Sequence, residues 1–126
     1  MTHGPRVLIA DDDAPVRALV AEVLTTSLGA DTAQAADGYQ ALRAVAAAPP
    51  DPVLLDLRLP VLDGLAVLRW LKRRPATARI PVLALTAAGP VETRHALDRG
   101  CAGFVAKPFD VDELVETIRP FLAPAA

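Results

Sequence analysis

Short apolar runs alternate with helix-like patterns along the whole chain. Four runs are almost uninterrupted by polar residues, as expected of parallel strands that are covered on both faces. These runs are Val7 to Ala10, Val53 to Leu55, Val82 to Leu85 and Phe104 to Ala106. Residues 30–35 alternate in polarity, which predicts an edge strand. The pattern therefore predicts a five-stranded parallel sheet.

Helix-like spacing fills the segments between and after these strands. The clearest helix repeats apolar residues at i, i+3, i+4, i+7 and i+8 from Val16, with Asp13 as a candidate N-cap and Gly29 as a stop. A fourth helix, near residues 91–99, is poor in apolar residues. Other helices are predicted at residues 39–47 and 65–73, and the last buries a face of Val111, Leu114, Val115 and Ile118. Alternating strands and helices predict a three-layer α/β sandwich with right-handed crossovers.

Composition and size narrow the class of protein. The 126 residues predict one domain, 1–126, with a core at about 5–122 and no appended output domain. A hydrophobic content of 52% and a net charge of −2 suggest neither disorder nor direct nucleic-acid binding. The one cysteine, Cys101, fits a reducing cytoplasm, and no apolar segment is long enough for membrane insertion.

Each central strand is followed by a residue suited to phosphate or metal chemistry. Asp11 and Asp12 follow the first strand, Asp56 the third, Thr86 the fourth and Lys107 the fifth. Ligands of open α/β sheets bind beyond the carboxyl ends of the strands, so these residues are expected to form one cluster. Clustered carboxylates repel one another, and Mg²⁺ suits their hard oxygens. Lys107 adds a fixed positive charge, and Thr86 adds a hydroxyl donor for a phosphoryl group.

The motifs that carry these residues resemble those of a known family. "VLIADDD", "VLLDLRLPVLDG", "ALTA" and "GFVAKPF" occur in the order and at the spacing of the response-regulator receiver (CheY-like) domain, the phospho-acceptor half of two-component signalling. The resemblance covers nearly the whole chain. It implies a flavodoxin-like, doubly wound (βα)5 fold with strand order 2-1-3-4-5.

The resemblance also implies how the acidic residues act. Asp56 would be the phospho-acceptor. Asp11 and Asp12 would hold Mg²⁺ together with Asp56 and the backbone carbonyl of Arg58. The side chain of Arg58, two residues after Asp56, and that of Ala88 would flank the pocket and tune the lifetime of the phosphoryl group.

The remaining family positions concern the response to phosphorylation. Thr86 would hydrogen-bond the phosphoryl group, and Lys107, followed by a cis bond to Pro108, would pair with it. Phe104 falls at the switch position and would turn inward when Thr86 moves toward the phosphate. The affected surface would comprise the fourth helix, the fifth strand and the fifth helix.

Partners and activity follow from the same resemblance. The donor would be the phosphohistidine of a histidine kinase or of a histidine phosphotransfer protein, and the downstream target stays undefined. The domain would promote only its own phosphorylation and dephosphorylation, so it would not be an enzyme for other substrates. The segment "GCAG", residues 100–103, lacks the acidic pair of many DNA-binding regulators, so a monomer or a weak dimer is expected.

Two other functions remain open at this point. A phosphohydrolase of the haloacid-dehalogenase type would carry its nucleophile on the first strand in an Asp-x-Asp pattern, which Asp11 and Asp13 supply. Such an enzyme would need a cap domain or longer loops to select a substrate. A receiver-shaped interaction module that is never phosphorylated would have no need of Asp56, Thr86 and Lys107 together.

Overall fold

Five parallel strands form one sheet in the order β2-β1-β3-β4-β5 in the computed structural model, which describes residues 5–122. The strands are β1 (Arg6–Ala10), β2 (Asp31–Ala35), β3 (Val53–Leu55), β4 (Val82–Thr86) and β5 (Gly103–Ala106). The strand order and the edge position of β2 confirm the predicted doubly wound fold. Strand order reverses between β1 and β3, which is where ligands bind in folds of this kind.

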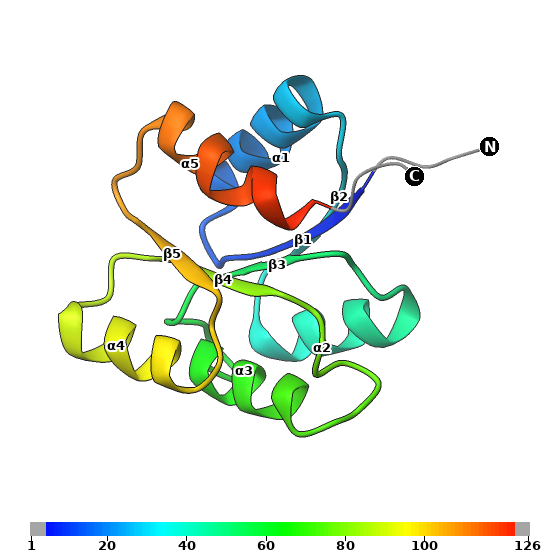
Figure 1. Cartoon of the computed structure of the whole chain (residues 1–126), viewed down its shortest axis with the longest axis vertical. Helices are drawn as coiled ribbons and strands as arrows, with labels where there is room; N and C mark the ends of the chain where they lie inside the picture. The colour runs from blue at the N-terminus through cyan, green and yellow to red at the C-terminus, as the bar shows by residue number, and fades with distance from the viewer. Residues whose placement is uncertain (1–4, 123–126) are drawn as a thin grey trace.

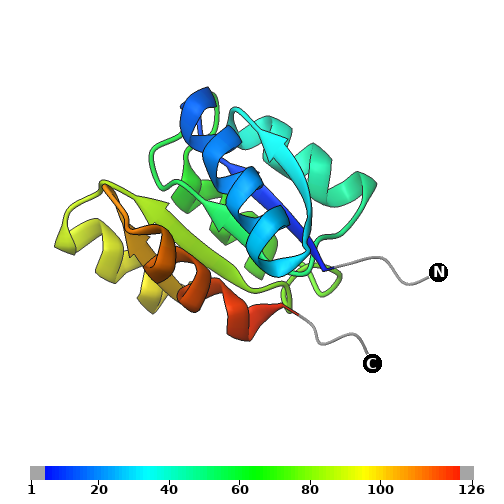
Figure 2. The same cartoon turned by 90° about the horizontal axis from the view of Figure 1, so that it is seen from above.

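Helices cover both faces of the sheet. They are α1 (Ala14–Leu28), α2 (Gly38–Ala47), α3 (Gly64–Lys72), α4 (Pro90–Asp98) and α5 (Val111–Ile118), and a 3₁₀ turn, η1 (Arg119–Phe121), follows. Figure 1 shows α1 and α5 on one face and α2, α3 and α4 on the other. Figure 2 shows the same layers from above. The predicted three-layer sandwich is confirmed.

The strands β1, β3 and β4 bury side chains on both faces, which explains their unbroken apolar runs. The same prediction is wrong for β5, an edge strand on which Phe104 and Ala106 are exposed. Leu8 and Leu55 belong to the core beneath α2 and α3, whereas Ile9 and Leu54 belong to the core beneath α1 and α5. All four side chains are at most 2% exposed. Because neighbouring residues of a strand point to opposite faces, β1, β3 and β4 each contribute to both cores.

Aspartates begin four of the five helices. The side chains of Asp13, Asp37, Asp63 and Asp110 accept hydrogen bonds from the first turns of α1, α2, α3 and α5. Such caps satisfy backbone N–H groups that have no partner within the helix. Gly29 ends α1 in a left-handed conformation with φ of 64°, as its position predicts. The helices therefore start at fixed positions beside the carboxyl ends of the strands.

The helices α4 and α5 bury different numbers of side chains. Ala96 is the one buried residue of α4, so its predicted lack of apolar anchoring is confirmed. The predicted inward face of α5 is confirmed for Leu114, Val115 and Ile118. It is wrong for Val111, whose side chain is 40% exposed. Val111 is the first residue of α5, and periodicity does not tell whether the core extends beneath a first turn.

Candidate functional site

Three carboxylates converge at the carboxyl end of the sheet. Asp11 and Asp12 lie between β1 and α1, and Asp56 follows β3 directly. One carboxylate oxygen from each lies within 4.8 Å of the others. Asp11 is fully buried and Asp56 is 5% exposed, whereas Asp12 is exposed. The cluster therefore opens to solvent on the side of Asp12.

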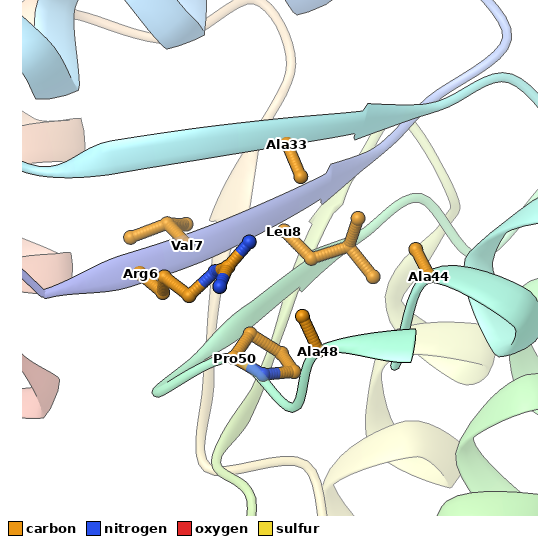
Figure 3. Close-up of a pocket in the computed structure, with 7 residues that line it drawn as sticks. All are labelled: Arg6, Val7, Leu8, Ala33, Ala44, Ala48 and Pro50. Carbon is orange, nitrogen blue, oxygen red and sulfur yellow. The ribbon is translucent and has the colours of Figure 1, made fainter. Parts of the chain in front are cut away.

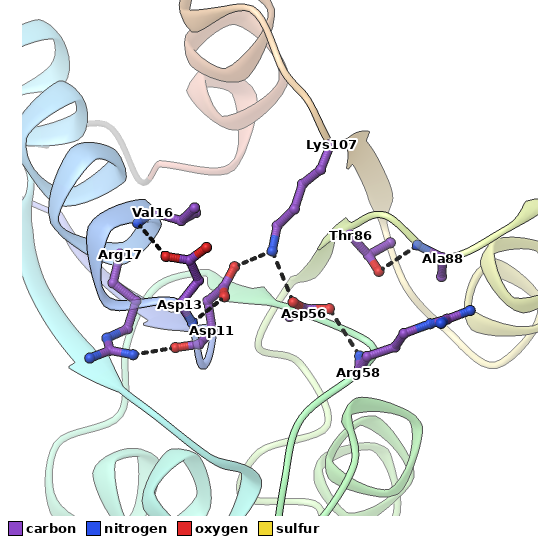
Figure 4. Close-up of polar contacts among 9 residues, drawn as sticks. All are labelled: Asp11, Asp13, Val16, Arg17, Asp56, Arg58, Thr86, Ala88 and Lys107. Carbon is purple, nitrogen blue, oxygen red and sulfur yellow. Dashed lines mark hydrogen bonds and ion pairs between the residues drawn. The ribbon is translucent and has the colours of Figure 1, made fainter.

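Lys107 bridges the two buried carboxylates. Its Nζ atom lies 2.5 Å from Asp11 Oδ2 and 2.9 Å from Asp56 Oδ2 (Figure 4). Burial alone lowers the pKa of Lys107, but hydrogen bonds and charge interactions with Asp11 and Asp56 outweigh burial and raise that pKa above its ordinary value. The Lys107–Pro108 bond is cis, as expected. Lys107 is thus a fixed cation shared by both carboxylates.

Backbone donors orient the same carboxylates. The amide of Asp13 donates to Asp11 Oδ1, and the amide of Arg58 donates to Asp56 Oδ1, both over 2.9 Å. Each carboxylate therefore has one oxygen bound by the backbone and the other by Lys107. This arrangement fixes the rotation of both side chains before any ligand binds.

Arg17 is a member of the site that sequence reasoning missed. Its Nη1 donates to the backbone carbonyl of Asp11 over 2.5 Å, and its Nε donates to Gln34 Oε1 over 3.2 Å. Arg17 therefore ties α1 and β2 to the loop that carries the acidic pair. The available signal was a basic residue one turn into the helix that follows three aspartates.

Thr86 ends β4 beside the acidic cluster and is 2% exposed. Its Oγ1 accepts a hydrogen bond from the amide of Ala88 over 3.0 Å. A hydroxyl that accepts one hydrogen bond can still donate its proton, so Thr86 is able to donate to an oxygen outside the protein. Figure 4 shows Thr86 and Asp56 at neighbouring strand ends.

Phe104 lies on β5, away from the acidic cluster, and is 46% exposed. It borders a groove of about 400 Å³ that Thr86, Leu97 and Ala106 also line. The groove is lined by residues of β4, α4 and β5. A smaller cavity of about 30 Å³ lies beside the amino-terminal half of β1 and is lined mainly by apolar residues (Figure 3). The acidic residues are not among its lining.

The geometry of the acidic cluster fits a hard divalent cation. Magnesium is bound in proteins by one or two carboxylates together with waters and phosphate oxygens. Asp11, Asp12 and Asp56 offer such oxygens within 4.8 Å of one another, and Asp12 is exposed to water. The role of the backbone carbonyl of Arg58 as a further Mg²⁺ ligand stays a prediction. Among residues 5–122, no helix has the length and hydrophobicity needed to span a bilayer.

Comparison with known proteins bears on this site. Residues 7–119 match the family model described as "Response regulator receiver domain". The DNA-binding dual master transcriptional regulator RpaA of Synechocystis is 40% identical over 94% of this chain. The chain spans about half the length of that relative, 49%. Sporulation initiation phosphotransferase F of Bacillus subtilis is 36% identical, with 93% of each chain covered.

Solved structures that resemble this chain are also receiver domains. The receiver domain of the sensor histidine kinase PA1611 from Pseudomonas aeruginosa, with a magnesium ion coordinated in its active-site cleft, is 35% identical. The two structures superpose with a TM-score of 0.81, covering 94% of this chain and 97% of that one. Receivers of this family interact with histidine kinases and phosphotransfer proteins. On its sequence match, strand order and overall structure, the chain belongs to the response regulator receiver domain family.

Proposed function

We propose that this receiver domain accepts a phosphoryl group on Asp56 from the phosphohistidine of a histidine kinase or a histidine phosphotransfer protein. A carboxylate oxygen of Asp56 attacks phosphorus, the phosphorus–nitrogen bond breaks, and the histidine leaves with its electron pair. The product is an aspartyl phosphate, which water later hydrolyses. The shared contact of Lys107 with Asp11 and Asp56 is the observation that carries this proposal.

Asp56 is a better nucleophile candidate than Asp11. Asp11 is fully buried. Asp56 retains 5% exposure, and β3, which it follows, lies beside β4, the strand that ends in Thr86. This difference argues against a haloacid-dehalogenase-type mechanism, which would use a nucleophile on the first strand.

Lys107 has two roles in the proposed reaction. Before transfer, its ammonium pairs with Asp56 Oδ2 over 2.9 Å and so holds the nucleophilic carboxylate in place. After transfer, the same ammonium pairs with the phosphoryl oxygens, and the hydroxyl of Thr86 donates to one of them. When bound, Mg²⁺ neutralises charge on the transferring oxygens, and we assign its binding to Asp11, Asp12, Asp56 and the carbonyl of Arg58.

The response would pass through Thr86 to the groove. As Thr86 moves toward the phosphoryl group, the ring of Phe104 turns into the space beside it. The surface of α4, β5 and α5 then changes shape for a downstream protein. α4 is the element best suited to move because one buried residue anchors it.

We also propose the compartment, the oligomeric state and the range of activity of the domain. It acts in the cytoplasm, where the buried free thiol of Cys101 stays reduced. It is a monomer or a weak dimer, it does not contact nucleic acid itself, and it catalyses no reaction beyond its own phosphorylation and dephosphorylation.

Acetyl phosphate tests this proposal without a known kinase. The wild-type protein, incubated with acetyl phosphate and Mg²⁺, is expected to gain the mass of one phosphoryl group, and Asp56→Asn is expected to gain none. Asp51→Asn is the control, because Asp51 lies at the opposite end of β3 and asparagine can still accept from the amide of Arg6. An unmodified wild type, or a modified Asp56→Asn, would overturn the proposal.

A further inference from the structure

An ion pair links the phosphorylation loop, the segment between β3 and α3 that begins with Asp56, to α4. The guanidinium of Arg58 lies 2.8 Å from Glu92 Oε1, and these side chains are 65% and 41% exposed. Arg58 lies in the loop after β3, and Glu92 lies in the first turn of α4. The pair joins segments 34 residues apart.

The pair acts on the least anchored helix of the domain. α4 buries Ala96 alone, and its N-cap, Gly89, offers no side-chain hydrogen bond. Little apolar area therefore opposes a shift of this helix. A contact from the phosphorylation loop to its first turn is therefore one of the few interactions that hold this helix in place.

The other end of Arg58 lies beside the phospho-acceptor. Its backbone amide donates to Asp56 Oδ1 over 2.9 Å, so its side chain starts next to the carboxylate. Figure 4 shows that side chain extending away from Asp56. Rotation about its side-chain bonds would bring the guanidinium back over Asp56. Ala88, with only a methyl group, places no polar side chain in competition.

We propose that Arg58 is a phosphoryl-binding residue that Glu92 withholds in the resting state. A phosphoryl group on Asp56 carries about two negative charges and accepts bidentate hydrogen bonds from a guanidinium, so it competes with the single carboxylate of Glu92. When Arg58 changes partner, the first turn of α4 loses its tie to the loop. This inference rests on the proposed phosphorylation of Asp56, and it adds a second route from that site to α4.

Beryllofluoride, a phosphoryl mimic, provides the test. Its binding to the whole protein at saturating Mg²⁺ is followed by fluorine magnetic resonance. Glu92→Gln is expected to raise the apparent affinity roughly two- to fivefold, the range for loss of an exposed ion pair. Arg58→Gln is expected to lower the affinity. The control is Asp98→Asn, which removes one negative charge from the same helix and breaks its Arg94–Asp98 pair.

The double variant separates direct exchange from long-range charge effects. Without Arg58 there is nothing for Glu92 to withhold, so Arg58→Gln/Glu92→Gln is expected to match Arg58→Gln. If charge alone acts, the two effects add and the double variant returns to the wild-type affinity. That result, or a Glu92→Gln affinity equal to that of Asp98→Asn, would overturn the inference. If beryllofluoride does not bind the wild type, the proposed function itself fails.

Discussion

Removing the negative charge of Asp12 should stabilise this protein when metal is absent. Among residues 5–122, no hydrogen bond involves the Asp12 side chain, so Asp12→Asn removes none. Its carboxylate lies within 4.8 Å of those of Asp11 and Asp56. Unit charges at such a separation repel by about 0.9 kcal/mol in water-like surroundings and by about 3.5 kcal/mol at an effective dielectric near 20.

Because Asp12 is exposed, the value for water-like surroundings, about 0.9 kcal/mol for each pair of charges, applies. Two repulsive interactions then amount to about 2 kcal/mol, and attraction to Lys107 offsets part of them. Asp12→Asn is therefore expected to raise the free energy of unfolding by about 1 kcal/mol in a chelator. Magnesium at tenfold excess over its dissociation constant stabilises the wild type by about 1.4 kcal/mol. A variant that lacks one of three carboxylates should gain much less.

The assay is urea unfolding with and without Mg²⁺, followed by the fluorescence of Trp70, the one tryptophan in the sequence. Asp12→Asn is expected to have a higher free energy of unfolding than the wild type in chelator. In Mg²⁺ its free energy of unfolding is expected to be equal to that of the wild type or lower. Asp31→Asn makes the same charge change at the opposite end of the sheet and should show no Mg²⁺-dependent difference. A destabilised Asp12→Asn in chelator, or equal stabilisation of both proteins by Mg²⁺, would refute the electrostatic reasoning.

Two further predictions concern the support of the site. Gly64→Ala is expected to lower the free energy of unfolding by about 2 to 3 kcal/mol, because its Cβ would lie 2.2 Å from the backbone oxygen of Asp56. Gly89→Ala, which meets open space, is the control, and equal stabilities would contradict the packing argument. Burial raises the pKa of the Cys101 thiol from 9.0 to about 11, so alkylation at pH 8 should be about 100-fold slower than in urea. The unfolded thiol ionises at a lower pH than the folded one. The stability contributed by the buried, protonated thiol is therefore present below pH 9 and lost between about pH 9 and pH 11. Alkylation of the folded protein at the rate of a free thiol would contradict this.

Local features of the chain were predictable because their causes are local. Asp13 caps α1 and Gly29 ends it because their own backbone preferences and hydrogen bonds decide the matter. Unbroken apolar runs identified the central strands, since burial on both faces removes the polar alternation. The strand order came from the family resemblance, because periodicity does not determine which strands are neighbours.

The site was predictable as a set of strand ends but not as a set of contacts. The rule for open α/β sheets places Asp11, Asp56 and Lys107 at one edge, and the structure brings them together. The bond from Arg17 to the carbonyl of Asp11 and the Arg58–Glu92 pair depend on tertiary geometry, which no local pattern encodes. Such contacts modify the site that the strand ends define.

Borohydride trapping is the most direct test that Asp56 is the acceptor. Sodium borohydride reduces an aspartyl phosphate to homoserine, so the modified residue can be located by peptide mass spectrometry. After incubation with acetyl phosphate and Mg²⁺, homoserine is expected at position 56 and nowhere else. Homoserine at position 11 or 12, or at no position, would contradict the account.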